Sequence, residues 1–242
     1  MGLTGMGGAS LMAPILVFIF HYQAKTAIGS DLAYAAIAKS FGAWQHKRAG
    51  SVDIAIVKNL AIGSVPASLL GVWLLHSIDK NGGAGADHLI TRILGVVLLV
   101  TATIMIARSI PKVEAAIEKR RDGKPLVDGR WAILVGAVGG FLVGLTSVGA
   151  GTLFGVALLV VFGMGARKMV GTDLYHAALL STAAAIGHIY AGDVNYSLVA
   201  NLLIGAIPGV LIGSHFSARM PEKALRPTLA TVLLATGIRT FI

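Results

Sequence analysis

The chain contains no cysteine among its 242 residues, and only 13% of its residues are charged. The absence of cysteine excludes disulfide bonds and thiolate metal sites, and it leaves the redox compartment undetermined. The scarcity of charge goes with 55% hydrophobic residues and a mean hydropathy of +0.79. So much apolar surface exceeds what one core can hide from water. The composition therefore predicts an integral membrane protein.

Glycine and basic residues are abundant. The 31 glycines would weaken soluble helices, but they suit the close packing of helices in a bilayer. The formal net charge is +9, yet the Lys and Arg residues lie between apolar runs and form no patch interleaved with aromatic residues. We therefore expect no nucleic-acid partner, and we attribute the basic excess to membrane topology.

Nine apolar runs follow one another along the chain. A helix needs about 20 residues to cross the hydrocarbon core of a bilayer. Several runs reach that length, but the first, fifth and sixth are short and bordered by glycines. Short helices at membrane depth must turn their free backbone groups toward protein or water, as in the binding sites of transporters. The runs span residues 8–22, 26–46, 54–78, 89–108, 131–146, 150–163, 168–190, 196–215 and 225–242.

The sequence repeats internally. A gapless shift of 142 residues aligns residues 2–71 with residues 144–213, and 26 of these 70 positions are identical. Composition alone would give only a handful of identities. The chain is therefore predicted to be two copies of one unit. The identical pairs include Gly29 with Gly171, Asp31 with Asp173, His46 with His188, Asn59 with Asn201 and Pro66 with Pro208.

Basic residues predict how the two copies lie in the membrane. Residues 108–130 carry seven Lys or Arg residues against four acids, which places this segment in the cytoplasm. We expect residues 131–146 and 150–163 to form a hairpin that returns to its starting side, so that Arg167 and Lys168 also lie inside. The alternative is one broken helix that crosses once, and it would place the basic turns outside.

Equivalent turns of the two copies then lie on opposite faces of the membrane. Lys47 and Arg48 of the first copy correspond to Ile189 and Tyr190 of the second, in agreement with opposite locations. Two copies inserted in opposite directions have two arrangements of nearly equal energy, each open to one side. This is the common basis of alternating access in transporters.

The predicted fold class is all-α, a polytopic transmembrane helical bundle built from two inverted-topology repeats with short broken or re-entrant helices. Residues 1–108 are expected to form the first, N-terminally short repeat, residues 109–130 a basic cytoplasmic linker, and residues 131–242 the second repeat. The first copy lacks the apolar approach that Trp131 begins in the second copy. We therefore expect either that an upstream half-helix has been lost or that this chain is a trimmed version of a longer one.

Four motifs of the first copy form a recognisable set. They read G-L-T-G-M-G-G-A-S-L-M-A-P from Gly2, A-K-T-A-I-G-S-D-L from Ala24, H-K-R-A-G-S-V-D from His46 and G-S-V-P-A-S-L-L-G from Gly63. Together they resemble the sulfite exporter TauE/SafE family of membrane transporters, and the resemblance covers nearly the whole chain. It implies a multi-pass protein of the cell inner membrane that exports or takes up small sulfur-containing anions, such as sulfite or organosulfonates, for example sulfoacetate.

Glycines and polar side chains beside the short helices are candidate substrate ligands. Backbone N–H groups at helix N-termini hold oxyanions, and hydroxyl groups add further donors. The alternative is that the glycines only permit helix crossing and that the hydroxyls bond within their own helices. The predicted substrate-binding residues are Thr4, Gly5, Gly7, Gly8, Ser10, Thr146, Ser147, Gly149, Gly151, Thr152, Asn59, Asn201 and Lys39.

Asp31 and Asp173 occupy identical positions inside apolar helices, where an unpaired carboxylate is costly and usually functional. They are the predicted proton-coupling residues, with Lys39 as a partner that neutralises an aspartate or attracts substrate. The alternative for both aspartates is a helix cap or a hydrogen bond between helices. For His46 and His188, near helix ends, a structural role is expected rather than ligation.

Other classes of function make different demands. An intramembrane serine protease would use Ser10 as the nucleophile with His176 or His188 as its base, but the duplicated hydroxyl of Thr152 favours symmetric ligand contact. A passive anion channel of the same fold remains an alternative, as does a purely structural membrane protein. We expect no enzyme activity, no cofactor and no metal. The sequence leaves the oligomeric state open, a homo-oligomer included.

Overall fold

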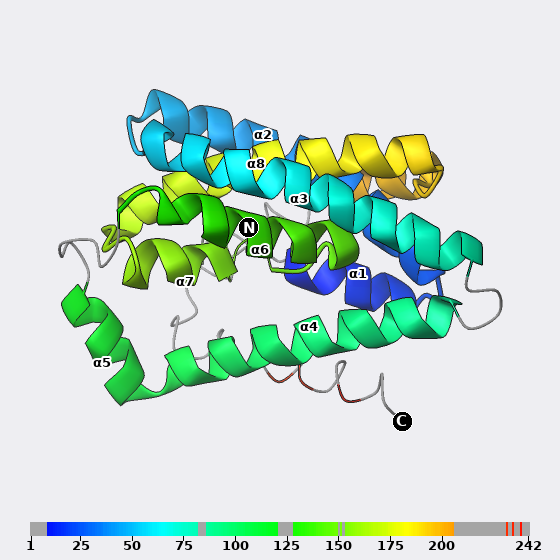
Figure 1. The fold of residues 1–242 in the computed structure, drawn as a ribbon, viewed down its shortest axis with the longest axis horizontal. Helices are drawn as coiled ribbons and strands as arrows, with labels where there is room; N and C mark the ends of the chain where they lie inside the picture. Colours follow the sequence, from blue (N-terminus) through cyan, green and yellow to red (C-terminus); the bar gives the residue numbers. More distant parts are fainter. Residues whose placement is uncertain are drawn as a thin grey trace.

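The computed structural model describes residues 9–81, 86–120, 128–149, 151 and 153–205, and the single residues 231, 234 and 238. This part of the chain is helical and contains no strand (Figure 1). Its helices are α1 (Ala9–Phe18), α2 (Ala24–Arg48), α3 (Ile54–Asn81), α4 (Ala86–Ser109), α5 (Pro111–Arg120), α6 (Trp131–Thr146), α7 (Leu153–Val160) and α8 (Ala166–Ala191), followed by the helical segment Tyr196–Gly205.

The helices fall into two classes of length. α2, α3, α4 and α8 have 25, 28, 24 and 26 residues, which at about 1.5 Å per residue exceeds the roughly 30 Å of a hydrocarbon core. Two stretches of the described chain, Ile54–Lys80 and Asp87–Ile104, are also apolar enough to cross a membrane. α1, α6 and α7 have 10, 16 and 8 residues, so each is too short to cross alone.

α2 and α8 pack against each other in opposite directions. Near the start of α2, the hydroxyl of Ser30 accepts a 3.0 Å hydrogen bond from the backbone N–H of Asn195, which lies just beyond the end of α8. Just beyond the end of α2, the backbone N–H of Asp53 donates a 3.0 Å hydrogen bond to Thr172, near the start of α8. The two helices are therefore joined at both ends.

α3 and α6 pack in parallel through small residues. Three glycines of α6, four residues apart, lie directly against backbone carbonyls of α3, so that no Cβ would fit at any of them. Such close approach brings two backbones into van der Waals contact without depending on a hydrophobic effect. The contacts are Gly136 with Leu60, Gly140 with Ser64 and Gly144 with Ser68.

α6 begins and α7 ends at the same end of the helix bundle. The Asn59 side chain, near the start of α3, donates a 3.1 Å hydrogen bond to the carbonyl of Gly129, just before α6. Lys168, near the start of α8 and shortly after α7, forms a 2.8 Å ion pair with Asp53, just before α3. Figure 1 shows α6 and α7 running side by side in opposite directions, so the pair has the geometry of a hairpin.

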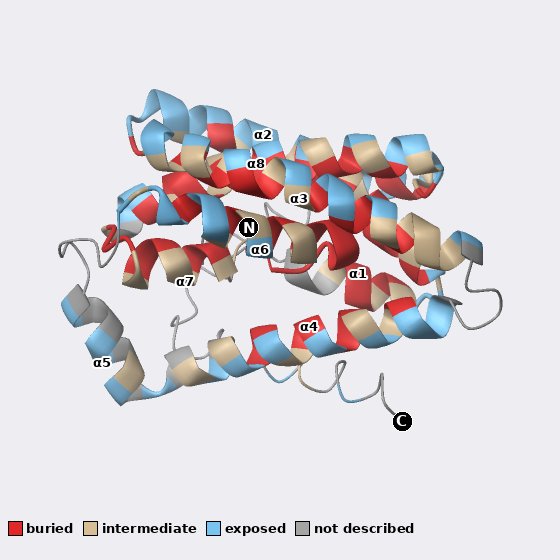
Figure 2. Cartoon of the chain, viewed as in Figure 1, coloured by how far each residue is buried: buried red, intermediate tan, exposed pale blue. Residues whose placement is uncertain are grey.

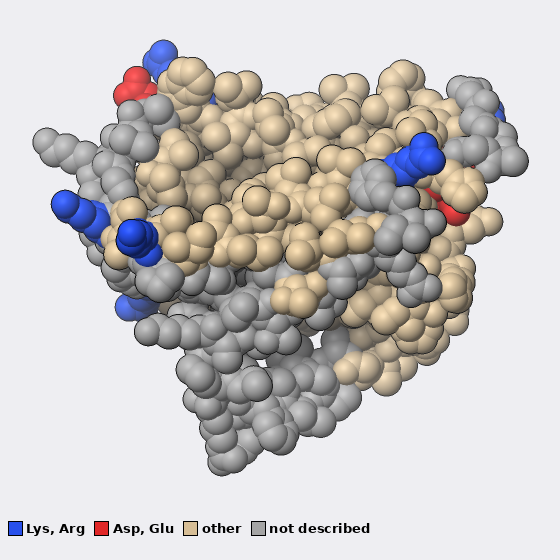
Figure 3. Space-filling view, turned by 90° about the horizontal axis from the view of Figure 1, so that it is seen from below, with Lys and Arg blue, Asp and Glu red and all other residues tan. Residues whose placement is uncertain are grey.

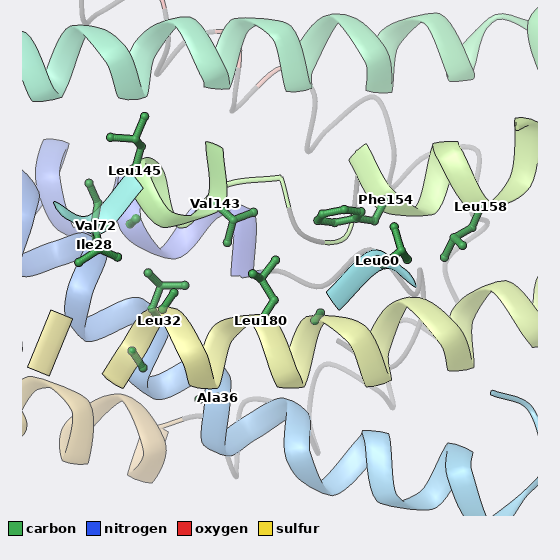
Figure 4. Close-up of a cluster of buried hydrophobic side chains, with 14 of the residues drawn as sticks. Ile28, Leu32, Ala36, Leu60, Val72, Val143, Leu145, Phe154, Leu158 and Leu180 are labelled. Atoms are coloured by element: carbon green, nitrogen blue, oxygen red, sulfur yellow. The ribbon is translucent and has the colours of Figure 1, made fainter. Parts of the chain in front are cut away.

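The apolar core lies where α2, α3, α6, α7 and α8 meet. Side chains from all five helices are buried together, and Figure 4 shows how they converge. The positions facing away from this core are exposed although many are also apolar (Figure 2). They include Phe41 at 73%, Trp73 at 66% and Leu70 at 59% exposed. An aqueous surface rarely exposes so many large apolar side chains, whereas lipid-facing helices do.

Charged side chains gather toward the two ends of the molecule. On the face that Figure 3 shows, the visible Lys, Arg, Asp and Glu side chains lie toward the ends of the long axis, and described residues between them are uncharged. This distribution fits a bundle whose helices run across a membrane. Helix α5 lies within the predicted linker, and the pattern of apolar runs did not indicate it because six of its ten residues are charged or proline.

Candidate functional site

Seven of the buried polar residues, on or next to the helices that meet in the core, make up the candidate site. All are at most 7% exposed, which is unusual for charged side chains and for histidine unless they have partners or a function. They come from α2, α3, α8 and the residue that follows α6. The residues are Asp31, Lys39, Ser64, Ser147, Asp173, His176 and Ser181.

Asp31 is held by the end of α6. The Ser147 hydroxyl donates a 2.6 Å hydrogen bond to Asp31 Oδ2, and Asp31 Oδ1 has no partner among the described residues. Ser147 caps α6 in a left-handed conformation with φ of 59°, which non-glycine residues rarely adopt. This backbone turn directs the hydroxyl away from its own helix and toward α2.

Lys39 lies between the two aspartates. It is 7% exposed and sits in the middle of α2, and its charge acts on both Asp31 and Asp173. Asp31 is near the start of α2 and Asp173 near the start of the antiparallel α8, so the two carboxyl groups lie toward opposite ends of the helix pair. Asp173 Oδ1 has no hydrogen-bond partner in the described part of the chain. One cation thus serves two separated acids.

His176 is fully buried beside this charge cluster. Its Nε2 lies 2.8 Å from the Ser64 hydroxyl of α3, and its ring meets Phe154 of α7 edge to face at a centroid distance of 4.6 Å. The Lys39 charge also acts on it. The second ring nitrogen, Nδ1, is buried and has no partner among the residues the structure describes. His176 therefore has one satisfied and one unsatisfied ring nitrogen.

The two histidines that recur in the repeat, His46 and His188, lie at helix ends. His188 is fully buried, and its two ring nitrogens lie 3.1 Å from Asp193 Oδ2 and 3.2 Å from the Gly144 carbonyl. His46 Nδ1 lies 2.9 Å from the Ser51 hydroxyl. Each imidazole thus bridges a helix end to the turn five residues later, which is a structural arrangement.

The structure brings together only some of the predicted site residues. Asp31, Asp173, Lys39 and Ser147 belong to the cluster. Thr146 instead donates to the carbonyl of Leu142 in its own helix, as the alternative interpretation of the hydroxyls expects. Gly149, with φ of 107°, and the half-buried Gly151 lie in the turn between α6 and α7.

Other predicted site residues lie apart or are not described. Asn59 bonds to Gly129 at the end of the bundle, and Asn201 is exposed on the segment after α8. Thr4, Gly5, Gly7, Gly8 and Thr152 lie outside the described residues, and the side chain of Ser10 in α1 is outside them as well.

Three members of the cluster were not predicted as substrate-binding or proton-coupling residues: Ser64, His176 and Ser181, of which His176 was named only as a base in the protease alternative. Small hydroxyls in apolar helices give no distinctive sequence signal, because most of them bond within their own helix. His176 does give one, since an ionisable residue three positions after Asp173 falls on the same face of a membrane helix.

Comparison with known proteins identifies the family to which the chain is similar. The model of the sulfite exporter TauE/SafE family matches residues 1–240. The chain is 41% identical to the probable membrane transporter protein YjnA of Bacillus subtilis, over 98% of this chain and 93% of that protein. It is also 28% identical to YdhB of Bacillus subtilis, over 97% and 94%, and 26% identical to MJ0441 of Methanocaldococcus jannaschii, over 98% and 88%, both named probable membrane transporter proteins.

No solved structure matches the chain. The family and the relatives indicate a membrane transporter rather than an enzyme, in agreement with the apolar exterior and the buried polar cluster. The chain belongs to the sulfite exporter TauE/SafE family of membrane transporters.

Proposed function

We propose that this protein is a multi-pass secondary transporter that moves small sulfur-containing anions, sulfite or organosulfonates such as sulfoacetate, across the cytoplasmic membrane by alternating access. The family to which the chain belongs supports the substrate class. The observation that carries the mechanism is the antiparallel pairing of α2 with α8, two helices that are copies of each other at a distance of 142 residues.

Matching hydrogen bonds support the proposal of an inverted repeat. Contacts recur at equivalent positions of the two copies in at least five pairs, and the two bonds of one pair join the ends of α2 and α8 reciprocally. Equivalent helices that lie antiparallel must enter the membrane from opposite sides if both cross it. The pairs are Asp53–Thr172 with Asn195–Ser30, Ile56–Asp53 with Leu198–Asn195, His46–Ser51 with His188–Asp193, Tyr22–Leu16 with Met164–Leu158, and Ala27–Gln23 with Met169–Gly165.

Charge asymmetry supports the orientation. The end of α2 and the starts of α3, α6 and α8 lie at one end of the bundle, joined by the Asp53–Lys168 and Asn59–Gly129 contacts. This end carries a surplus of cations, whereas Lys25 and Asp79 balance each other at the opposite end through a 2.7 Å ion pair. By the positive-inside rule the first end is cytoplasmic. Its cations are Lys47, Arg48, Lys58, Arg130, Arg167 and Lys168.

The buried acids support coupling to protons. With cytoplasm at the start of α8, Asp173 lies toward the inside and Asp31 toward the outside, with Lys39 between them. One ammonium cannot neutralise two distant carboxylates at once, so a proton on the other acid removes the cost of a buried charge. When the Lys39 ammonium pairs alternately with Asp31 and with Asp173, the protein has two states, one suited to the outward-facing arrangement and one to the inward-facing arrangement.

The glycine-rich turns complete the proposed anion path. The turn between α6 and α7, with Gly149 and Gly151, ends at the start of a short helix, and the N-terminal end of a helix favours an oxyanion. The first copy offers the equivalent residues Thr4, Gly5, Gly7, Gly8 and Ser10. We propose that the anion approaches these turns from the cluster around Lys39.

A flux assay in proteoliposomes tests the proposal. Purified protein should take up sulfite or sulfoacetate in a saturable manner, at a rate that changes when a pH gradient is imposed, while equal concentrations of acetate give no saturable uptake. A passive channel of the same fold would give unsaturable flux that is indifferent to the pH gradient. Liposomes with the protein but no flux of any sulfur oxyanion would contradict the proposed substrate class.

A further inference from the structure

His176 has an unsatisfied hydrogen-bonding group whose direction is fixed. The imidazole is held on one side by Ser64, 2.8 Å from Nε2, and on another by the edge-to-face contact with Phe154. Neither contact involves Nδ1, which is buried without a partner in the described part of the chain. Buried polar atoms are nearly always paired, so an orphan on a fixed ring calls for a ligand.

The bond to Ser64 indicates which nitrogen carries the proton. The Ser64 hydroxyl has no other acceptor among the described residues, so donating its proton to Nε2 satisfies both groups. In a neutral imidazole the proton then resides on Nδ1, which becomes an N–H donor. The opposite tautomer would leave two groups unsatisfied, the hydroxyl proton and the Nδ1 lone pair, at a cost of about one more buried hydrogen bond.

The surroundings of His176 favour an anion as its ligand. The Lys39 ammonium is the cation whose charge acts on His176, and Asp173 lies one helical turn before it on α8. Ser181, farther along the same helix, has a buried hydroxyl without a partner in the described chain. A fixed N–H donor near an ammonium suits an oxygen that carries negative charge.

We infer that His176, together with Lys39, forms a binding subsite for one oxygen-bearing anion, with the Nδ1 N–H as its directional donor and the ammonium as its counter-charge. This inference rests on the proposed transport function for the identity of the anion, and it assigns the residue that contacts it. Ser64 and Phe154 are positioning residues, because they act only through the orientation of the ring.

Two amide substitutions distinguish binding from packing. In the same rotamer an Asn side chain places its N–H near the position of Nδ1, whereas a Gln side chain places its N–H near Nε2. His176→Asn therefore keeps the proposed anion donor and loses the Ser64 contact, and His176→Gln does the reverse. We expect the KM for sulfite to rise about tenfold or more in His176→Gln and clearly less in His176→Asn, because a hydrogen bond to a charged group is strong.

The experiment uses the full chain in proteoliposomes, with sulfite flux for KM and thermal unfolding in detergent for binding. His46→Gln, which alters an imidazole at a helix end, is the matched control and should leave KM unchanged. Lys39→Met should raise KM in the same direction as His176→Gln. A higher KM in His176→Asn than in His176→Gln would overturn the subsite and leave transport intact. Equal KM values in all variants, with normal flux, would do the same.

The binding measurement separates the two claims. If the wild-type protein transports no sulfite, the proposed function fails. The subsite is still supported if sulfite, sulfate, thiosulfate or nitrate gives saturable thermal stabilisation of the wild type and His176→Gln abolishes it. Stabilisation by none of these four anions, or by all of them equally in the wild type and in His176→Gln, would overturn it.

Discussion

The Ser147 hydroxyl donates a 2.6 Å hydrogen bond to Asp31 Oδ2 and so fastens the end of α6 to α2. The bond joins a residue of the second predicted repeat to one of the first. It requires the left-handed backbone of Ser147, where φ is 59°. Ser147 thus has a strained backbone and Asp31 is a buried acid, and strained residues are found at functional sites more often than elsewhere.

Two substitutions at Ser147 separate the hydrogen bond from the strain. Ser147→Ala removes the only hydrogen bond that the described residues give the Asp31 carboxyl but keeps the strained φ, so we expect the free energy of unfolding to fall by about 1–3 kcal/mol. Ser147→Gly loses the same bond and gains roughly 1 kcal/mol back, because glycine adopts positive φ without penalty. Thermal unfolding in detergent measures both. A Ser147→Ala variant as stable as the wild type would show that the bond is dispensable.

The two aspartates are expected to affect transport more than folding. Asp31→Asn and Asp173→Asn keep the size of the side chain but cannot exchange a proton. We expect sulfite flux to fall at least tenfold and to lose its response to a pH gradient, with little change in the yield of folded protein. Asp128→Asn, on the exposed segment before α6, is the control and should transport normally. Normal pH-dependent flux in both variants would remove the aspartates from the mechanism.

Much of the helical layout could be predicted from the sequence, because membrane helices are marked by long apolar runs and broken ones by glycine. The short runs at residues 8–22 and 150–163 correspond to α1 and α7, which are shorter still. Helix α5 could not be predicted in this way, since a charged helix outside the apolar core carries no such signal. Its existence depends on local propensity and contacts rather than on hydropathy.

The candidate site could be predicted only in part. Asp31, Asp173 and Lys39 were identifiable because ionisable residues in apolar helices are rare. The role of Ser64 depends on which face of α3 meets α8, and periodicity does not fix the rotation of one helix against another. Asn59 and Asn201 recur in the repeat, yet Asn59 lies at a helix end and Asn201 on the exterior. The repeat therefore showed that Asn59 and Asn201 occupy equivalent positions, but it did not show whether either residue contacts the site.

Gly63 and Gly205 are equivalent positions in different surroundings. A Cβ on Gly63 would meet the carbonyl of Ile133 in α6, whereas a Cβ on Gly205 would meet nothing within 4 Å. Gly63→Ala should therefore push α3 away from α6 and lower stability by about 1–3 kcal/mol or prevent folding. Gly205→Ala should be neutral or slightly stabilising, because alanine favours helix. Thermal unfolding and expression of the two variants compare them directly, and equal effects would contradict the close packing of α3 with α6.

The Asp53–Lys168 ion pair makes stability depend on pH at the end of the bundle where α3 and α8 begin. Burial acts to raise the pKa of Asp53, but the hydrogen bonds from Lys168 and from the Ile56 backbone outweigh it and hold the pKa below its ordinary value of 3.8. A lowered pKa in the folded state stabilises the protein above pH 3.8, and this stabilisation is lost as the pH falls through the folded-state pKa.

Asp53→Asn should remove this dependence while keeping the helix cap. Asn195, the equivalent residue, already accepts a 3.0 Å hydrogen bond from the Leu198 backbone as Asp53 does from Ile56. We expect the variant to be less stable than the wild type at pH 7 and to approach it near pH 3. Thermal unfolding in detergent at pH 7 and at pH 3 checks this. A difference in stability between the two proteins that grows toward acid pH would contradict the predicted direction.

The central claim is that the two repeats cross the membrane in opposite directions, and the cysteine-free sequence allows a direct measurement. Arg48 and Tyr190 are exposed and occupy equivalent positions at the ends of α2 and α8. Arg48→Cys and Tyr190→Cys are each treated with a membrane-impermeant thiol reagent in intact and in permeabilised cells. Opposite insertion predicts that Tyr190→Cys is labelled in intact cells and that Arg48→Cys is labelled only after permeabilisation. Labelling of both from the same side would contradict it.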